Sequence, residues 1–271
     1  MHCSSIVLAF HMDHGGSGIP AWREALADAA QAAGRVAGLG WAPEAAGNLS
    51  LRLPIPAAGA LPAEPLRAFP LPTTWPRLAG QWFLISLAGS TMVQIAAEPA
   101  AHTAVCQVRD DAQALLARST AATDEAWQPT SELAAHLAVQ HCLTPIGRTQ
   151  RAVLHAHLPN LARVSLPYAQ EGSTELNAAL HEVAPQLAEA VPRGVEFVAG
   201  APGSLELGQR TARAAAQTPL VVWPGHGALA WAATLNLAVS LLELAELAAS
   251  AVLHRCRLVE PLAPPAPLDS A

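Results

Sequence analysis

Two short apolar runs, each followed closely by histidine, constrain this chain more than any other feature. Residues 152–154 (Ala-Val-Leu) precede His155 and His157, and residues 220–222 (Leu-Val-Val) lead to His226. Short runs of this kind are typical of buried strands. Because side chains at i and i+2 of a strand point to the same face, the first run is predicted to present two imidazoles side by side. Neighbouring positions of the two strands in one sheet would bring all three imidazoles together.

Three converging histidines predict a metal site. Three protein ligands with an open fourth position are the pattern of catalytic rather than structural zinc. We therefore expect His155, His157 and His226 to hold Zn²⁺, with manganese, cobalt and iron as alternatives because imidazole also accepts these ions. A His-x-His pair is also common as ordinary solvated or hydrogen-bonded histidines, so the prediction depends on the residues around it.

The charged residues exclude several kinds of chemistry. The formal net charge is −6, and all 15 basic residues other than histidine are arginines. A chain without lysine cannot form a Schiff base through a lysine amine, so carbonyl chemistry here would need a metal or an oxyanion site. We expect no nucleic-acid partner and no anionic-membrane partner, since neither fits a chain without a basic patch.

The rest of the chain alternates helical and strand-like segments, which indicates the α/β class and a single domain. Residues 54–80 are rich in proline and are predicted to be a long surface loop. Helices are expected at about 22–39, 133–142, 175–190, 204–217 and 234–256. Strands are expected at about 49–53, 82–85, 104–109, 113–118, 152–157, 195–198 and 220–222.

The two ends are expected to lie outside the folded domain. We predict a poorly ordered leader at 1–20, a domain at 21–257 and a Pro-rich tail at 258–271. The opening residues lack the basic region of a secretory signal, and the four scattered cysteines are typical of reduced thiols, so we expect a cytoplasmic protein. The apolar stretch 228–253 contains Glu243 and Glu246 and is expected to be a core-packed helix rather than a membrane span.

Glu132 is the candidate catalytic residue. It stands in the first turn of the helix that ends shortly before the histidine strand. A carboxylate there could ligate the metal or act as a general base on a metal-bound substrate. A glutamate in a first helical turn also complements the helix dipole without any catalytic role.

Three small polar turns predict an anion site. Backbone N–H groups in glycine-containing turns and at a helix N-terminus bind anions, and hydroxyl groups add donors. Such turns also arise for purely conformational reasons. The candidate substrate-binding residues in these turns are Gly47, Asn48, Gly89, Ser90, Thr130 and Ser131.

Taken in order along the chain, these motifs resemble the class II aldolase/adducin family, and most closely its rhamnulose-1-phosphate aldolase branch. The resemblance covers roughly residues 22–256. It rests on Gly47-Asn48-Leu49-Ser50-Leu51-Arg52-Leu53, Ala88-Gly89-Ser90, Pro129-Thr130-Ser131-Glu132-Leu133 with His136, His155-Ala156-His157, Pro202-Gly203-Ser204 with Gly208, and Trp223-Pro224-Gly225-His226-Gly227.

The resemblance implies a three-layer α/β/α fold around a central, mainly antiparallel sheet. It implies a lyase that cleaves a ketose 1-phosphate into dihydroxyacetone phosphate and an aldehyde through a metal-stabilised enediolate. His155, His157 and His226 match the family's zinc ligands, and Glu132 matches the glutamate that moves the proton. The family also implies a homotetramer with active sites between subunits.

Three features depart from the family pattern. Residues 45–48 (Ala-Ala-Gly-Asn) have one polar side chain fewer than the family's phosphate loop, and the turn at 88–92 lacks a nearby basic residue. The second active-site carboxylate is Glu175 or Glu182, or it is absent, with Gln186 in its place. Local spelling favours Glu175, whereas counting back from His226 favours Gln186, with Glu182 close by.

Two other functions use the same residues. A sugar-phosphate epimerase or a dehydratase would also form a metal-bound oxyanion, so the ligands do not distinguish them from an aldolase. A non-catalytic, adducin-like interaction protein would keep the fold without a working metal site. The complete histidine set argues against that last alternative.

Overall fold

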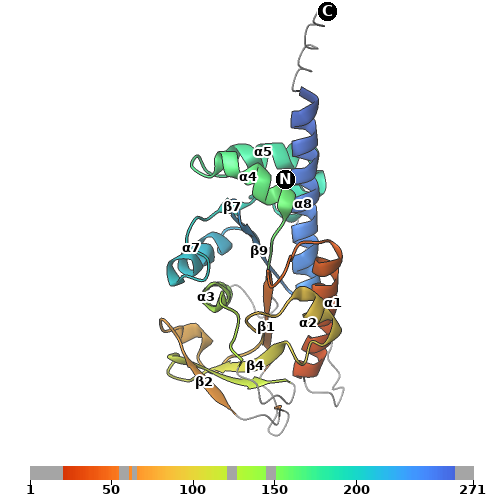
Figure 1. Cartoon of the computed structure of the whole chain (residues 1–271). Coiled ribbons are helices and arrows are strands. Elements are labelled where there is room, and N and C mark those ends of the chain that lie inside the picture. Colours follow the sequence, from red (N-terminus) through yellow and green to blue (C-terminus); the bar gives the residue numbers. More distant parts are fainter. Residues whose placement is uncertain (1–20, 55–60, 63–65, 121–126, 145–150, 260–271) are drawn as a thin grey trace, which may run out of the picture.

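The protein is an α/β domain built on one mixed sheet (Figure 1). The computed structural model describes residues 21–54, 61–62, 66–120, 127–144 and 151–259, with side chains as far as Arg255. Its strands are β1 (Asn48–Leu53), β2 (Arg67–Pro70), β3 (Trp82–Ser86), β4 (Thr103–Val108), β5 (Ala114–Ser119), β6 (Ala152–Ala156), β7 (Glu196–Phe197), β8 (Leu220–Trp223) and β9 (Gly227–Ala232). They lie in the order β2-β5-β4-β3-β1-β6-β9-β8-β7.

Helices cover both faces of this sheet. The helices are α1 (Ala21–Gly38), α2 (Met92–Ala97), α3 (Leu133–Leu143), α4 (Pro159–Ser165), α5 (Thr174–Val183), α6 (Pro185–Ala190), α7 (Leu205–Ala215) and α8 (Leu235–Val259), with 3₁₀ turns η1 (Pro76–Leu78) and η2 (Leu166–Tyr168). The core on one face joins α1 and α8 to the sheet, and the cores on the other face lie under α3 and α7 (Figure 1). Every strand pairing is antiparallel except that of β7 with β8. The predicted α/β/α fold is confirmed.

Strand alternation separates an apolar face from a polar one at the centre of the sheet. In β1, Leu49, Leu51 and Leu53 belong to the core under α1 and α8. The intervening Ser50 points the other way and meets His136 of α3. In the neighbouring β6, Leu154 joins the α8 core, and His155 lies on the opposite face. The period of two therefore turns the polar residues of both strands toward α3.

The two histidine strands are not direct neighbours, contrary to the simplest expectation. β9 lies between them and pairs antiparallel with both β6 and β8. The apolar stretch 228–253 was predicted to be a core-packed helix, but its first residues form β9 and the helix begins only at Leu235. Ala228, Ala230 and Ala232 are buried, and a short alanine-rich run has no strong strand propensity.

Other segments differ from expectation in detail. Residues 54–80 are not wholly loop, because β2 and η1 lie within them. The helix predicted at 175–190 is two helices, since Ala184 before Pro185 adopts φ −137° and ψ 81° and breaks the helix. The short helices α2 and α4 were not predicted. Expectations for residues 1–20 and for the tail beyond Val259 lie outside the described residues.

The long helix α8 packs on the sheet. Its segment Leu235–Arg255 is long and apolar enough to cross a membrane, but length and composition alone are weak evidence, and 44% of its most apolar window is buried inside the protein. Its two acidic residues have partners in the fold. Glu243 accepts a hydrogen bond from Arg35, and Glu246 accepts bonds from the backbone at Asn160 and Leu161. These contacts favour a helix that belongs to the core.

The close approach of α7 to α3 requires glycine at position 208. A Cβ atom on Gly208 would lie 2.9 Å from the backbone of Ala134 and of Ala135. These two residues stand in the first turn of α3, directly after Glu132 and Leu133. The contact at Gly208 therefore sets where the start of α3 lies over the sheet.

Gly208→Ala is expected to lower the free energy of unfolding by about 1–3 kcal/mol, because the added methyl group meets backbone that has no room to yield. Chemical denaturation measures the change.

The matched control is Gly34→Ala on α1, where the nearest atom to a new Cβ is 3.7 Å away. Alanine there should be neutral or should stabilise the helix by up to about 1 kcal/mol. Equal stability changes in the two variants would contradict the packing argument.

Candidate metal centre

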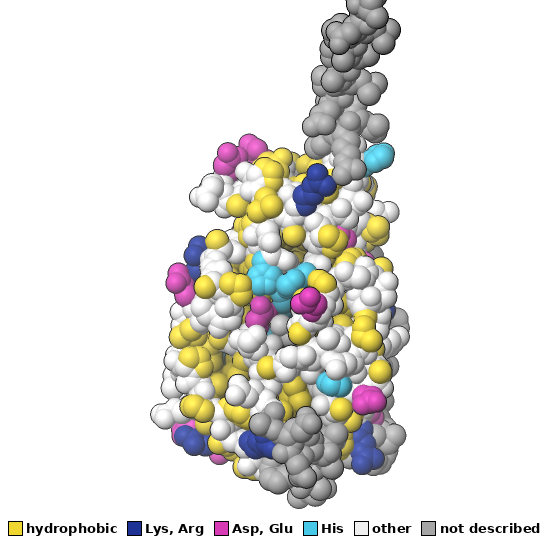
Figure 2. All heavy atoms as spheres, viewed as in Figure 1, with side chains coloured by type: hydrophobic (Ala, Val, Ile, Leu, Met, Phe, Trp, Pro, Cys, Tyr) yellow, Lys and Arg dark blue, Asp and Glu magenta, His cyan; other side chains and the backbone are white. Residues whose placement is uncertain are grey.

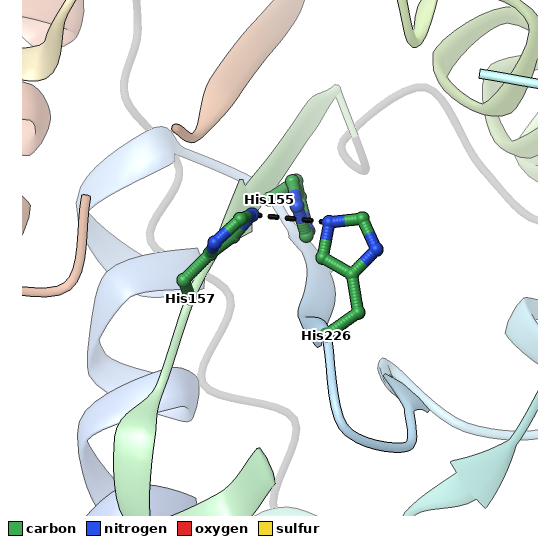
Figure 3. A group of neighbouring side chains, drawn as sticks. All are labelled: His155, His157 and His226. Atoms are coloured by element: carbon green, nitrogen blue, oxygen red, sulfur yellow. Dashed lines mark hydrogen bonds between the residues drawn. The ribbon is translucent and has the colours of Figure 1, made fainter. Parts of the chain in front are cut away.

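Three histidine side chains meet where β6 ends (Figure 3). His155 is in β6, His157 follows that strand directly, and His226 lies in the turn that joins β8 to β9. One ligand atom from each residue lies within 4.8 Å of the others. The Nε2 atoms of His157 and His226 are 3.1 Å apart. The structure thus brings together the three predicted ligands from positions about 70 residues apart.

The turn carrying His226 lies close to β6 because position 227 is glycine. A Cβ on Gly227 would lie 2.5 Å from the oxygen of Ala156 and 2.9 Å from Cε1 of His155. Any side chain there would push β9 away from β6 and separate the histidines. Sequence reasoning identified the motif, and the structure supplies the reason for its second glycine.

The tautomer of His155 leaves a nitrogen free to bind a metal. Its Nδ1 donates to the carbonyl oxygen of Ala228 at 2.9 Å, so the proton of the neutral ring is on Nδ1. Its Nε2 is buried and has no hydrogen-bond partner among the described residues. An unpaired buried nitrogen is costly unless a ligand completes it. The donor set therefore fits a divalent cation.

The surroundings favour the neutral form of His155 and of His157. Burial, together with His157 and His226, holds the pKa of His155 well below its ordinary value. Burial and His226 also lower the pKa of His157. The His155 ring lies 4.5 Å, centroid to centroid, from that of Trp223, whose indole N–H donates to Thr211. Neutral imidazole is the form that binds metals, so the environment of His155 and His157 favours metal binding.

Glu132 borders the histidine cluster. Its Oε2 is 3.6 Å from Nε2 of His155, and its Oε1 is 3.9 Å from Nε2 of His226. The residue is 7% exposed and stands at the N-cap of α3, where its side chain makes no capping hydrogen bond. Figure 2 shows histidine side chains gathered in the middle of one face, next to acidic side chains. The carboxylate therefore faces the cluster and does not cap the helix.

A buried series of hydrogen bonds connects Glu132 to Asn48, His136 and Ser50. Nδ2 of Asn48 donates to Oε2 of Glu132 at 3.1 Å. Oδ1 of Asn48 lies 2.6 Å from Nε2 of His136, and Nδ1 of His136 lies 2.9 Å from the hydroxyl of Ser50. Burial lowers the pKa of His136 to about 4, so the ring is neutral at neutral pH. Sequence analysis noted His136 only as part of a motif and gave it no role.

The three polar turns lie at one end of β1 and β3. Leu49 N–H donates to the Ser86 hydroxyl, and Thr130 N–H donates to the Ser86 carbonyl. Leu87 forms a bridge with Pro129. Gly47 and Gly89 adopt φ angles of +83° and +77°, which favour glycine. The structure thus brings the turns together, with Thr130 buried and Ser131 exposed.

A histidine missed by the sequence analysis joins one of these turns. Nδ1 of His102 lies 3.0 Å from the hydroxyl of the buried Ser90. The carbonyl of His102 accepts a hydrogen bond from the N–H of Leu87, which fixes it beside the turn. The turn at 88–92 lacks a basic residue in sequence, and His102 supplies one in space. No sequence pattern links His102 to Ser90, because 12 residues separate them.

The candidates for a second carboxylate lie on the surface. Glu175 is exposed in the first turn of α5, and Gln186 is exposed in α6. Glu182 pairs with Arg255 at 2.7 Å. Within the described part of the chain, none of the three contacts the histidine cluster.

Comparison with known proteins agrees with this geometry. Residues 27–253 match the family model described as Class II Aldolase and Adducin N-terminal domain. Rhamnulose-1-phosphate aldolase of Shigella sonnei (strain Ss046) is 33% identical over 215 residues, covering 76% of this chain and 76% of that protein.

Solved structures share the fold. A sugar-phosphate aldolase from Thermotoga maritima has a TM-score of 0.75 at 23% identity and covers 89% of this chain and 98% of its own. L-fuculose-1-phosphate aldolase from Thermus thermophilus has a TM-score of 0.55 at 18% identity, with 89% and 100% covered. The chain therefore belongs to the class II aldolase and adducin family, and within it to the metal-dependent lyases.

Proposed function

We propose that the protein is an aldolase that cleaves a ketose 1-phosphate into dihydroxyacetone phosphate and an aldehyde. The observation that carries the proposal is the carboxylate of Glu132 within 3.6 Å of Nε2 of His155, a buried nitrogen with no hydrogen-bond partner among the described residues. Likeness to a rhamnulose-1-phosphate aldolase over most of the chain supports the substrate class.

His155, His157 and His226 would hold the metal, with zinc as the first choice because three imidazoles are a typical zinc ligand set. When bound, the ion supplies a Lewis acid for the carbonyl and hydroxyl oxygens of a substrate. The donor atom of His155 is oriented by the Ala228 carbonyl, so the ring need not turn to bind.

Glu132 is assigned the proton transfer. Cleavage of the carbon–carbon bond leaves the electron pair on the ketone fragment as an enediolate, and carbon must then gain a proton. In cleavage the Glu132 carboxylate takes the proton of the hydroxyl group that becomes the aldehyde carbonyl and gives it to the carbon of the ketone fragment, and in aldol addition the same proton moves in reverse. Its distances of 3.6 Å to Nε2 of His155 and 3.9 Å to Nε2 of His226 support this role, since a substrate bound at the cluster would lie next to the carboxylate.

The polar turns are assigned to the phosphate end of the substrate. Gly47, Gly89, Ser131 and Thr130 offer backbone N–H groups or hydroxyls at one end of the sheet. Ser90 with His102 completes the set. The Asn48 amide is not part of it, because Glu132 and His136 hold both of its ends. A homotetramer with sites between subunits, and a cytoplasmic location, stay predictions.

Purified protein is expected to carry roughly one divalent ion per subunit. His155→Ala should lower metal affinity by more than about 100-fold, since loss of a ligand costs more than the 10–100-fold typical of its outer partners. Elemental analysis after dialysis measures the content.

The control is His141→Ala, because His141 is a partly buried histidine of α3 that the cluster does not include. Wild-type protein free of metal after growth with added zinc would contradict the assignment.

A panel of ketose 1-phosphates is expected to include one that releases dihydroxyacetone phosphate, detected with a coupled reductase. Glu132→Gln should keep the metal and lose about 10²–10⁴-fold in kcat, because an amide cannot exchange a proton with carbon. Isomerised sugar without triose release would indicate an epimerase, and loss of water would indicate a dehydratase.

His102→Ala is expected to raise KM for the phosphorylated ketose about tenfold while kcat changes less than about threefold, because one hydrogen bond to the phosphate is lost. The matched control is the same ketose without phosphate, whose KM should not change. An equal rise for both sugars would show that His102 only supports the fold.

A further inference from the structure

The buried His136 is the group that the proposed mechanism leaves unused. It is 0% exposed, although a histidine in an apolar core needs partners for both ring nitrogens. Those partners are Asn48 and Ser50, both of β1. Because Asn48 is also the residue that contacts Glu132, the ring lies one side chain away from the proposed proton-transfer group.

The direction of each hydrogen bond follows from Glu132. A carboxylate only accepts, so Asn48 must turn its Nδ2 toward Glu132 and its Oδ1 toward His136. Oδ1 only accepts, so Nε2 of His136 carries the proton. In a neutral ring Nδ1 is then an acceptor, and it takes the hydroxyl proton of Ser50.

The series of hydrogen bonds ends at Gln140, which is bonded to both β1 and the residue before β6. Gln140, one turn after His136 on α3, donates to the Ser50 hydroxyl at 3.3 Å and to the Arg151 carbonyl at 2.9 Å. Every link from Gln140 to Glu132 therefore has one direction. Reversing the Asn48 amide would place an oxygen against the carboxylate and an N–H against another N–H, so the orientation is fixed.

We propose that His136 is a positioning residue, which acts through the Asn48 amide to hold the Glu132 carboxylate against the histidine cluster. It touches neither metal nor substrate. The proposal deepens the proposed function, since it rests on Glu132 as the proton-transfer group. It assigns to α3 two residues of the site, one at the helix start and one a turn later.

Two substitutions at position 136 separate positioning from support of the fold. The amide nitrogen of glutamine reaches the place of Nε2 and still donates to Asn48. The amide of asparagine reaches only the place of Nδ1 and leaves Asn48 without its donor. We expect His136→Gln to stay within about tenfold of wild-type kcat and His136→Asn to lose about 100-fold, as for a misplaced catalytic group, with KM and metal content little changed.

The matched controls are His141→Gln and His141→Asn on the same helix, which should both keep wild-type kcat. If neither variant of His136 folds, Ser50→Ala removes the hydroxyl that orients Nδ1 and that accepts from Gln140, and it should lower kcat about 3–10-fold because it weakens the far end of the network. The proposal would be overturned if His136→Gln, His136→Asn and Ser50→Ala all had the same kcat as one another, per folded and metal-loaded subunit.

Two readouts do not depend on turnover. Nitrogen-15 NMR of the wild-type protein should show His136 as the neutral Nε2–H tautomer, and a crystal structure of His136→Asn should show Glu132 turned away from His155. If no ketose 1-phosphate is cleaved, the proposed function fails while these readouts still test the positioning. A charged ring, the other tautomer or an unmoved Glu132 would overturn the positioning alone.

Discussion

The packing of α3 over the polar face of β1 and β6 is the contact on which the site depends. These two central strands bury polar side chains, and a buried polar group without a partner costs about 1–3 kcal/mol. For Ser50 and Asn48 of β1 the partners come from α3, through His136 and Gln140, whereas His155 of β6 bonds to the carbonyl of Ala228 in β9. One helix therefore satisfies the sheet and carries Glu132 at its start, so stability and function share the same hydrogen bonds.

Close backbone approaches make that arrangement compact. Gly208 lets α7 lie against the first turn of α3, and Gly227 lets β9 lie against the histidine strand. The core on the other face is built largely from Ala, Leu and Val, which suits the 4% aromatic content of the chain. Small residues thus hold the layers near one another, and a single methyl group at either glycine would move a functional side chain.

The residues of the candidate site could be predicted from the sequence because local patterns determine them. The period of two, the Gly-His-Gly turn and the Thr-Ser-Glu helix start were enough to select the residues that meet at the cluster. The sequence did not predict β9, because a short alanine-rich run has little strand propensity and pairs only through its neighbours. The sequence also left β8 and β6 as possible direct partners, because the pairing of two distant strands cannot be determined from the residues of either strand alone.

The roles of His136 and His102 were hidden for a related reason. Each contacts a residue that the sequence does not link to it, Asn48 and Ser90 respectively, and no spacing rule joins them. His136 did leave one signal. It stands four residues after Glu132, so the two share a face of α3, and a buried helix with few polar residues would direct both toward the sheet.

The charge of the centre favours a cation over any other occupant. Burial and mutual repulsion keep His155 and His157 neutral, so they contribute lone pairs and no positive charge. The Glu132 carboxyl group lies beside them, 3.6 Å from Nε2 of His155, and offers oxygen atoms that also suit a cation. A divalent ion held by the imidazoles would use the nitrogen that His155 leaves unpaired. In a chain without lysine, that ion would also be the electrophile for carbonyl chemistry.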